Sequence, residues 1–181
     1  MGTIKATNIQ TITGSGTLTL GTSGETLTVP TGVTVGGTMS NTPAFRATMS
    51  ADQTVSDSTW TKINFDTIDY DTNSAYSTTN NRFTVPTGYA GKYLFTAGTN
   101  FYLDDTRRLS INLQVNGSFR NFNRVDVESA SANSFTCITS SFVGEFSAGD
   151  YIEAYTLQLN GNNRGLNKNY VEFTGFKLIG T

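Results

Sequence analysis

From residue 42 to its end, the sequence consists of short runs in which apolar and polar residues alternate, with turn residues between the runs. An alternation with a period of two places successive side chains on opposite faces of a β-strand, so this pattern predicts an all-β fold. Gly, Thr, Ser and Asn are abundant, which favours strands and turns over helices. The spacing is typical of a sandwich or barrel, with strands predicted at 43–50, 59–65, 81–86, 91–103, 107–116, 118–128, 134–146, 150–160 and 169–179.

The strongest local signal is the pair Asn116 and Gly117 between two of these runs. Both residue types accept the positive φ that a type I′ turn requires, so the pair predicts a two-residue hairpin. Together with Ser118 the pair forms an Asn-Gly-Ser glycosylation sequon. Residues 1–10 contain one lysine and no apolar stretch of the kind found in a secretion signal. We therefore interpret the pair as a turn.

Charge divides the chain into two segments near Asn41. Residues 1–41 carry two charged side chains, Lys5 and Glu25, and all other charges lie in 42–181. In the first segment, the units at 18–20, 27–29 and 33–35 each place two apolar side chains on one face and a threonine on the other. One short chain cannot bury such faces, so we predict a β-rich stalk or virion-anchoring segment whose rungs stack with identical chains about a threefold axis. A flexible Gly/Ser/Thr linker remains the alternative.

Several predicted strands are apolar on both faces, which an isolated sandwich does not need. In 169–179, Phe176 and Leu178 lie on one face and Phe173 lies on the other. One face can fill the core, and because no helix is predicted to cover the second face, we predict a subunit interface there. Strands that pass under loops remain the alternative. The residues assigned to the trimer interface or to the core are Phe45, Tyr93, Phe95, Tyr170, Phe173, Phe176 and Leu178.

The side-chain chemistry argues against an enzyme. The chain has no histidine, which excludes a Ser-His-Asp triad and imidazole metal ligands. The acidic cluster of Asp66, Asp69 and Asp71 could supply oxygen ligands for Ca²⁺ or one member of a glycosidase pair. The cluster lacks the glycine and the distal glutamate of a calcium loop, so we keep its residues only as calcium candidates. We predict no catalytic residue and no cofactor.

Charge and hydropathy disfavour two classes of partner. The formal net charge is -2 and no run of one sign occurs, so we predict no basic surface for nucleic acid or for an anionic membrane. No stretch approaches the roughly 20 apolar residues that a membrane span needs, so we predict no membrane insertion. Cys137 is the only cysteine, so no intrachain disulfide can form, and its place within a predicted strand predicts a buried thiol.

Two polar loops are the candidate contact surfaces. Residues 104–108 join two predicted core strands, and residues 160–169 precede the last strand. Binding residues concentrate on loops that a rigid sandwich carries, and the second loop could hydrogen-bond a host surface glycan or an acidic envelope protein. An ordinary solvated loop is the alternative, since Asn and Gly also build turns. The candidate contact residues are Asp104, Arg107, Asn162, Asn163, Arg164 and Lys168.

Six short motifs of the second segment follow the order of a known family. They are PAFRA at 43–47, INFD at 63–66, RFTVP at 82–86, GKYLF at 91–95, GDYI at 149–152 and FTGFKL at 173–178. The ordered set resembles the globular head of complement component 1q, part of the jelly-roll superfamily shared with tumour necrosis factor. This resemblance covers residues 42–181 and implies a ten-stranded jelly roll that assembles as a homotrimer. It also implies that the sheet holding the first and last strands faces the threefold axis, and some members of the family bind calcium.

The first segment departs from that family. Animal members usually follow a collagen stalk, whereas residues 1–41 show no Gly-X-Y period; their Gly/Thr-rich rungs resemble the shaft segments of bacteriophage fibre and virion appendage proteins. The two resemblances imply a phage structural protein on the virion surface, either a trimeric tail fibre or a capsid or tail appendage. Residues 1–41 would contact other virion proteins, and the head would bind the host. The alternatives are a secreted ligand-binding module of the complement type and a polysaccharide-depolymerising spike.

Overall fold

The computed structural model describes residues 26, 28, 30–32, 41–103, 107–127 and 134–179. Contacts between Cα atoms divide the chain into two units, Met1–Val35 and Gly36–Thr181. All the strands described below belong to the second unit. The rungs predicted at 18–20, 27–29 and 33–35 fall almost entirely outside the described residues, so the stalk and its boundary at 41 stay predictions.

The first sheet of this unit has five antiparallel strands. Their order is β10 (Ser134–Phe146), β7 (Gly91–Leu103), β13 (Phe173–Lys177), β1 (Ala44–Thr48) and β4 (Thr67–Asp71). The first strand, β1, therefore lies beside the last, β13, with Phe45 opposite Gly175. We call this layer the five-stranded sheet.

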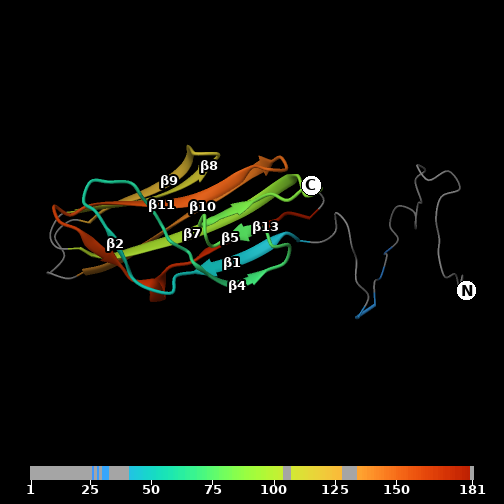
Figure 1. Cartoon of the computed structure of the whole chain (residues 1–181), viewed down its shortest axis with the longest axis horizontal. Helices are drawn as coiled ribbons and strands as arrows, with labels where there is room; N and C mark the ends of the chain where they lie inside the picture. The colour runs from blue at the N-terminus through green and yellow to red at the C-terminus, as the bar shows by residue number, and fades with distance from the viewer. Residues whose placement is uncertain are drawn as a thin grey trace, which may run out of the picture. The chain divides into compact units, whose positions relative to one another are not determined.

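The second sheet has six strands and packs face to face against the first (Figure 1). β5 (Tyr76–Ser77), β6 (Arg82–Thr84), β11 (Tyr151–Leu159), β8 (Arg107–Val115) and β9 (Ser118–Val127) follow in order. β3 (Thr61–Lys62) pairs with a separate stretch of β11. A small sheet joins β2 (Gln53–Val55) to β12 (Arg164–Leu166), and the 3-10 helix η2 (Lys168–Tyr170) follows β12.

The inner faces of the two sheets enclose an aromatic core. Phe45 on β1 stacks on Phe83 of the opposite sheet, with ring centroids 5.0 Å apart, and meets Phe173 edge-to-face, also at 5.0 Å. A Cβ on Gly175 would collide with the ring of Phe95, so this contact explains why a glycine interrupts the apolar pattern of β13. The aromatic side chains that are 1% exposed or less are Phe45, Phe65, Phe83, Tyr93, Phe95, Phe101 and Phe173.

The long strands lie where the alternation predicts them. β7 and β10 have the predicted bounds, and β8, β9 and β11 differ from prediction by no more than one residue at either end. The hairpin is confirmed, because φ is 51° at Asn116 and 75° at Gly117, as a type I′ turn requires. The strands β2, β4, β5 and β12 lie outside the predicted ranges.

The predicted strand 169–179 is wrong in its first residues. Lys168–Tyr170 forms η2 instead, and β13 begins at Phe173. The side chain of Asn167 accepts a hydrogen bond from the Asn169 N–H (3.0 Å) and caps η2. A local bond of this kind competes with strand pairing and leaves no trace in an apolar pattern. Among the residues that the structure describes, no helix is long and apolar enough to cross a membrane.

Candidate binding surfaces

The outward face of the five-stranded sheet carries a row of apolar side chains. The register places Val143 on β10 opposite Leu94 on β7. Leu94 is in turn opposite Phe176 on β13, and Phe176 is opposite Ala44 on β1. Val143 is 57% exposed, and the other three residues are partly exposed. We call these four residues the apolar row, and no described segment buries it.

The next row on this face is polar. The hydroxyl groups of Thr96 and Ser141 share a hydrogen bond of 2.9 Å. Further along the row, Arg46 Nε donates a hydrogen bond to Glu172 Oε2 (2.9 Å), and Arg46 Nη1 forms an ion pair with Asp69. The hydrogen bond to Glu172 is the main cause of the raised pKa of the Arg46 guanidinium. This face therefore combines an apolar row with an exposed network of charges.

The structure divides the seven predicted interface or core residues between two environments. Those in the core are Phe45, Tyr93, Phe95 and Phe173. Phe176 lies in the apolar row, and Leu178 is partly exposed just beyond the end of β13. Tyr170 is 59% exposed, with its ring 4.7 Å from that of Phe135. The sequence analysis misses Val143, for which the only signal is its place in the alternation of 134–146.

The predicted contact loop at 160–169 is held by internal hydrogen bonds. Asp57 Oδ1 accepts hydrogen bonds from the N–H groups of Asn160 and the residue after it, both at 2.8 Å. The side-chain oxygen of Asn163 accepts a bond from the Asp57 N–H (3.3 Å), and the carbonyl of Asn162 accepts one from Gln158 Nε2 (2.9 Å). β12 follows directly. Two of the contact candidates, Asn162 and Asn163, thus stabilise the turn itself.

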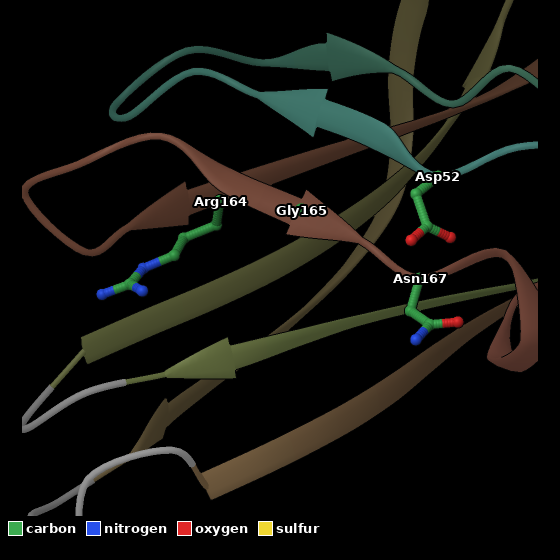
Figure 2. A pocket seen from close by; sticks show the side chains of 4 residues that line it. All are labelled: Asp52, Arg164, Gly165 and Asn167. Carbon is green, nitrogen blue, oxygen red and sulfur yellow. The ribbon is translucent and has the colours of Figure 1, made fainter.

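A shallow pocket of about 280 Å³ lies beside β12, lined by Asp52, Arg164, Gly165 and Asn167 (Figure 2). The Lys168 N–H donates a hydrogen bond to Asp52 Oδ1 (3.0 Å), which fixes this carboxylate. Figure 2 shows the Asp52 and Asn167 side chains near each other and the Arg164 guanidinium apart from them. A Cβ on Gly165 would meet no atom within 4 Å, so β12 leaves the pocket open there.

The remaining contact candidates do not line this pocket. Lys168 Nζ donates a hydrogen bond to the carbonyl oxygen of Ser50 (3.0 Å). Asp104 lies outside the described residues, and of Arg107 only the backbone at the start of β8 is described. Of the six predicted contact residues, the pocket therefore contains Arg164.

The acidic cluster predicted as a calcium candidate is divided among three partners. Asp66 accepts hydrogen bonds from the Ser50 hydroxyl (2.6 Å) and N–H (2.7 Å), and the hydroxyl bond is the main cause of the lowered pKa of Asp66. Asp69 pairs with Arg46, and Asp71 accepts a bond from the backbone at the start of β5 (2.8 Å). Within the described ranges, no group of three or more His, Cys, Asp or Glu side chains could hold a metal ion.

The prediction of a buried thiol at Cys137 is wrong. Cys137 is exposed. It lies on β10, an edge strand with β7 on one side, and faces outward beside Asn100. Partial burial raises the pKa of the thiol, which lowers the fraction of reactive thiolate. A position within a strand predicts burial only where both faces of that strand are covered.

The outward face of the six-stranded sheet carries a charged pair and two aromatic rings. Lys62 Nζ lies 2.5 Å from Glu153 Oε1, and the Glu153 side chain is 8% exposed. The Tyr155 hydroxyl donates a hydrogen bond to Glu153 Oε2 (3.3 Å), and burial, followed by the charge of Glu153, raises the pKa of Tyr155. The rings of Trp60 and Phe119 meet edge-to-face, with centroids 5.3 Å apart. No sequence motif groups these residues, because they come from separate parts of the chain.

Comparison with known proteins identifies the fold. No family model and no curated protein matches the sequence. Among solved structures, the globular domain of zebrafish complement 1qA protein is similar, with a TM-score of 0.51 and 18% identity over 75% of this chain and 97% of that chain. Eiger TNF from S. frugiperda and murine APRIL at pH 5.0 each give a TM-score of 0.55 at 14% identity. They cover 76% and 75% of this chain, and 93% and 98% of their own chains. These likenesses confirm the predicted all-β jelly-roll fold.

Proposed function

We propose that this chain is the subunit of a phage virion structural protein, a homotrimeric fibre or a capsid or tail appendage, whose jelly-roll head binds a host surface. The fold that it shares with complement and TNF-type domains supports a non-enzymatic binding module. The Gly/Thr-rich rungs of residues 1–41 support the virion assignment. In this proposal those residues attach the head to other virion proteins.

The observation that carries the trimer is the uncovered apolar row. The row lies on the sheet in which β1 pairs with β13, and the resemblance to the complement 1q head implies that this sheet would face the threefold axis. Burying an apolar side chain of this size contributes about 1.5–3 kcal/mol. Three copies of Val143, Leu94 and Phe176 buried together supply enough apolar surface to favour a closed ring of identical chains.

Light scattering of the full-length chain, and of a truncation that begins at Asn41, tests this assembly. We expect three times the chain mass for both, where the full-length chain is 19.5 kDa, because the interface lies in the head. Val143→Asp should convert the truncated trimer to a monomer, since it places a carboxylate in the apolar row. Phe119→Asp, on the opposite sheet, is the matched control and should leave the mass unchanged. A trimer for the full-length chain alone would assign assembly to residues 1–41, and a monomer for both would contradict the proposal.

The virion assignment needs a separate test. Antibodies raised against residues 42–181 should label intact purified virions, with the label at a fixed place on the particle. A particle that lacks the chain would contradict the assignment while leaving the trimer unaffected.

A secreted ligand-binding module of the complement type is the second candidate, favoured by the likeness to the zebrafish complement 1qA globular domain. The labelling experiment separates it from the first. The polysaccharide-depolymerising spike has less support, because Asp66, Asp69 and Asp71 each bind a different group. If polysaccharide cleavage were observed and all three changed to Asn left it undiminished, the cluster would have no catalytic role.

A further inference from the structure

The single tryptophan of the chain lies on the outward face of the six-stranded sheet. In β3, Thr61 is opposite Thr156, which is fully buried and shares a hydrogen bond of 3.0 Å with Thr99 of the five-stranded sheet. Thr61 therefore points inward, and its neighbours Trp60 and Lys62 point outward. A tryptophan is usually among the most buried side chains of a domain, so its place outside the core calls for a physical explanation.

The contact between Trp60 and Phe119 spans the middle of this sheet. β3 pairs with β11, β11 pairs with β8, and β8 pairs with β9, on which Phe119 lies. β3 and β9 are thus separated by three strand spacings of about 4.8 Å each. The two rings nevertheless meet edge-to-face, with centroids 5.3 Å apart and planes inclined by 67°. We call this pair the aromatic platform.

Polar side chains on the outward face of β8 are buried beside the aromatic platform. Ser110, Asn112 and Gln114 alternate with the core residues of this strand and point away from the core. All three are nevertheless buried, at 2%, 0% and 7% exposure. Phe119 itself is 53% exposed, so the upper surface of the platform is open to solvent.

Lys62, Glu153 and Tyr155 form a hydrogen-bonded group at the rim of the platform, in which the two charges compensate each other. Lys62 and Glu153 form a close ion pair, and Tyr155 donates to the same carboxylate. Across β11 and β8, the register places Glu153 opposite Gln114, and Gln114 opposite Phe119. A charged ligand would find the Lys62 charge already neutralised. The surface therefore suits a neutral ligand that has both an apolar face and hydroxyl groups.

We propose that the aromatic platform is a carbohydrate-binding surface. A sugar ring presents a face of C–H groups that can pack on exposed aromatic rings, while its hydroxyl groups meet Lys62 and Tyr155 at the rim. The platform spans several strands and has no deep walls, which fits a chain of neutral sugars lying across the sheet. It lies on the sheet opposite the apolar row, so assembly and sugar binding can occur together. This inference deepens the proposed surface-binding function and rests on it for the biological source of the sugar.

Trp60 is itself the reporter for the test, because the chain contains one tryptophan. The full-length chain is titrated with maltohexaose, cellohexaose and chitohexaose while the emission of Trp60 is recorded, and its retention on immobilised gastric mucin is measured before and after periodate oxidation. We expect a saturable change in emission with at least one sugar, and retention that periodate abolishes. Phe119→Ala and Phe119→Leu should weaken binding roughly tenfold or more, because each removes an aromatic stacking contact.

Tyr170→Ala is the matched control, since Tyr170 is an aromatic residue of similar exposure outside the platform. It should bind as the unchanged chain does. Three results would overturn the inference. They are unchanged binding by Phe119→Ala, no response to any probe, and retention on mucin that survives periodate, which would indicate a protein partner. Light scattering of the same samples separates the two proposals. A trimer that binds no sugar contradicts the platform alone, whereas a monomer that binds sugar contradicts the assembly alone.

Discussion

The outward faces of the two sheets are covered in different ways. On the six-stranded sheet, the outward-facing Asn112 of β8 is 0% exposed within the single chain, and Trp60 and Phe119 meet edge-to-face. On the five-stranded sheet, no described segment lies over the apolar row, and Val143 is 57% exposed. A strand with large side chains on both faces therefore does not identify a subunit interface by itself. The cover can come from the same chain, and only the face that lacks it is a candidate for assembly.

The largest expected change in stability comes from a substitution in the core between the two sheets. Phe45→Ala should lower the free energy of unfolding by about 3–5 kcal/mol, because it leaves a cavity among stacked rings. Guanidinium unfolding is followed by circular dichroism, which reports both sheets, and by Trp60 fluorescence, which reports the six-stranded face. We expect the two signals to change together in both variant and parent. If circular dichroism and Trp60 fluorescence gave transitions at different denaturant concentrations, the two sheets would unfold independently. That result would contradict a single core shared by both sheets.

A smaller effect should distinguish the ion pairs of the two faces. Glu153→Ala leaves Lys62 partly buried without its carboxylate, and we expect a loss of about 1–2 kcal/mol. Glu172→Ala removes an exposed partner of Arg46, whose side chain is 44% exposed, and should cost less than about 1 kcal/mol. Both are measured by denaturant unfolding in the Val143→Asp background, so that assembly does not contribute. Equal losses of stability in Glu153→Ala and Glu172→Ala would contradict the conclusion that the six-stranded sheet has the more covered outward face.

The smallest effect concerns pH. Hydrogen bonds from Ser50 lower the pKa of Asp66 near the end of β1, and the bond from Asn116 lowers the pKa of Asp150 beside the β8–β9 hairpin. A carboxyl group whose pKa is lower in the folded state stabilises the fold above its ordinary value of 3.8, and this contribution is lost as the pH falls through the folded-state value.

Stability should therefore decline as the pH is lowered below about 4, and Asp66→Asn and Asp150→Asn should each reduce that decline. Thermal unfolding at pH 7 and pH 3 measures the change. Asp66 directly precedes β4 of the five-stranded sheet, and Asp150 directly precedes β11 of the six-stranded sheet. We expect the two substitutions to reduce the loss of stability at low pH by similar amounts. An unchanged decline in both variants would show that other groups control the acid response.

The predictable part of the fold comprises the elements whose signal is local. The alternation in 91–103 and 134–146 is long enough to define β7 and β10, and the two residues after β8 specify their turn by conformation alone. β4 escapes prediction because four of its five residues are exposed, so no buried face marks it, and β12 because it has only three residues. η2 escapes because a hydrogen bond from the Asn169 N–H to the Asn167 side chain outweighs the apolar pattern that follows it.

The candidate surfaces were less predictable, for a related reason. The sequence indicates that 160–169 is polar. It does not indicate that Asp57, about 100 residues earlier in the chain, accepts hydrogen bonds from the backbone at the start of this loop and fixes its conformation. It indicates an acidic cluster, but partners such as Ser50 and Arg46 separate its members. The aromatic platform has no sequence signal, since Trp60 precedes β3 and Phe119 lies on β9, and these two strands are not neighbours in the sheet.

The sequence by itself determined that this chain is all-β, where its long strands lie, and which motifs follow the order of the complement 1q head. These properties depend on side-chain periodicity and on local backbone preference, both of which act over a few residues. Only the tertiary structure decided which outward face is covered and which is open. That outcome depends on which strands become neighbours across the sandwich, because burial is a property of residues brought together from distant parts of the chain.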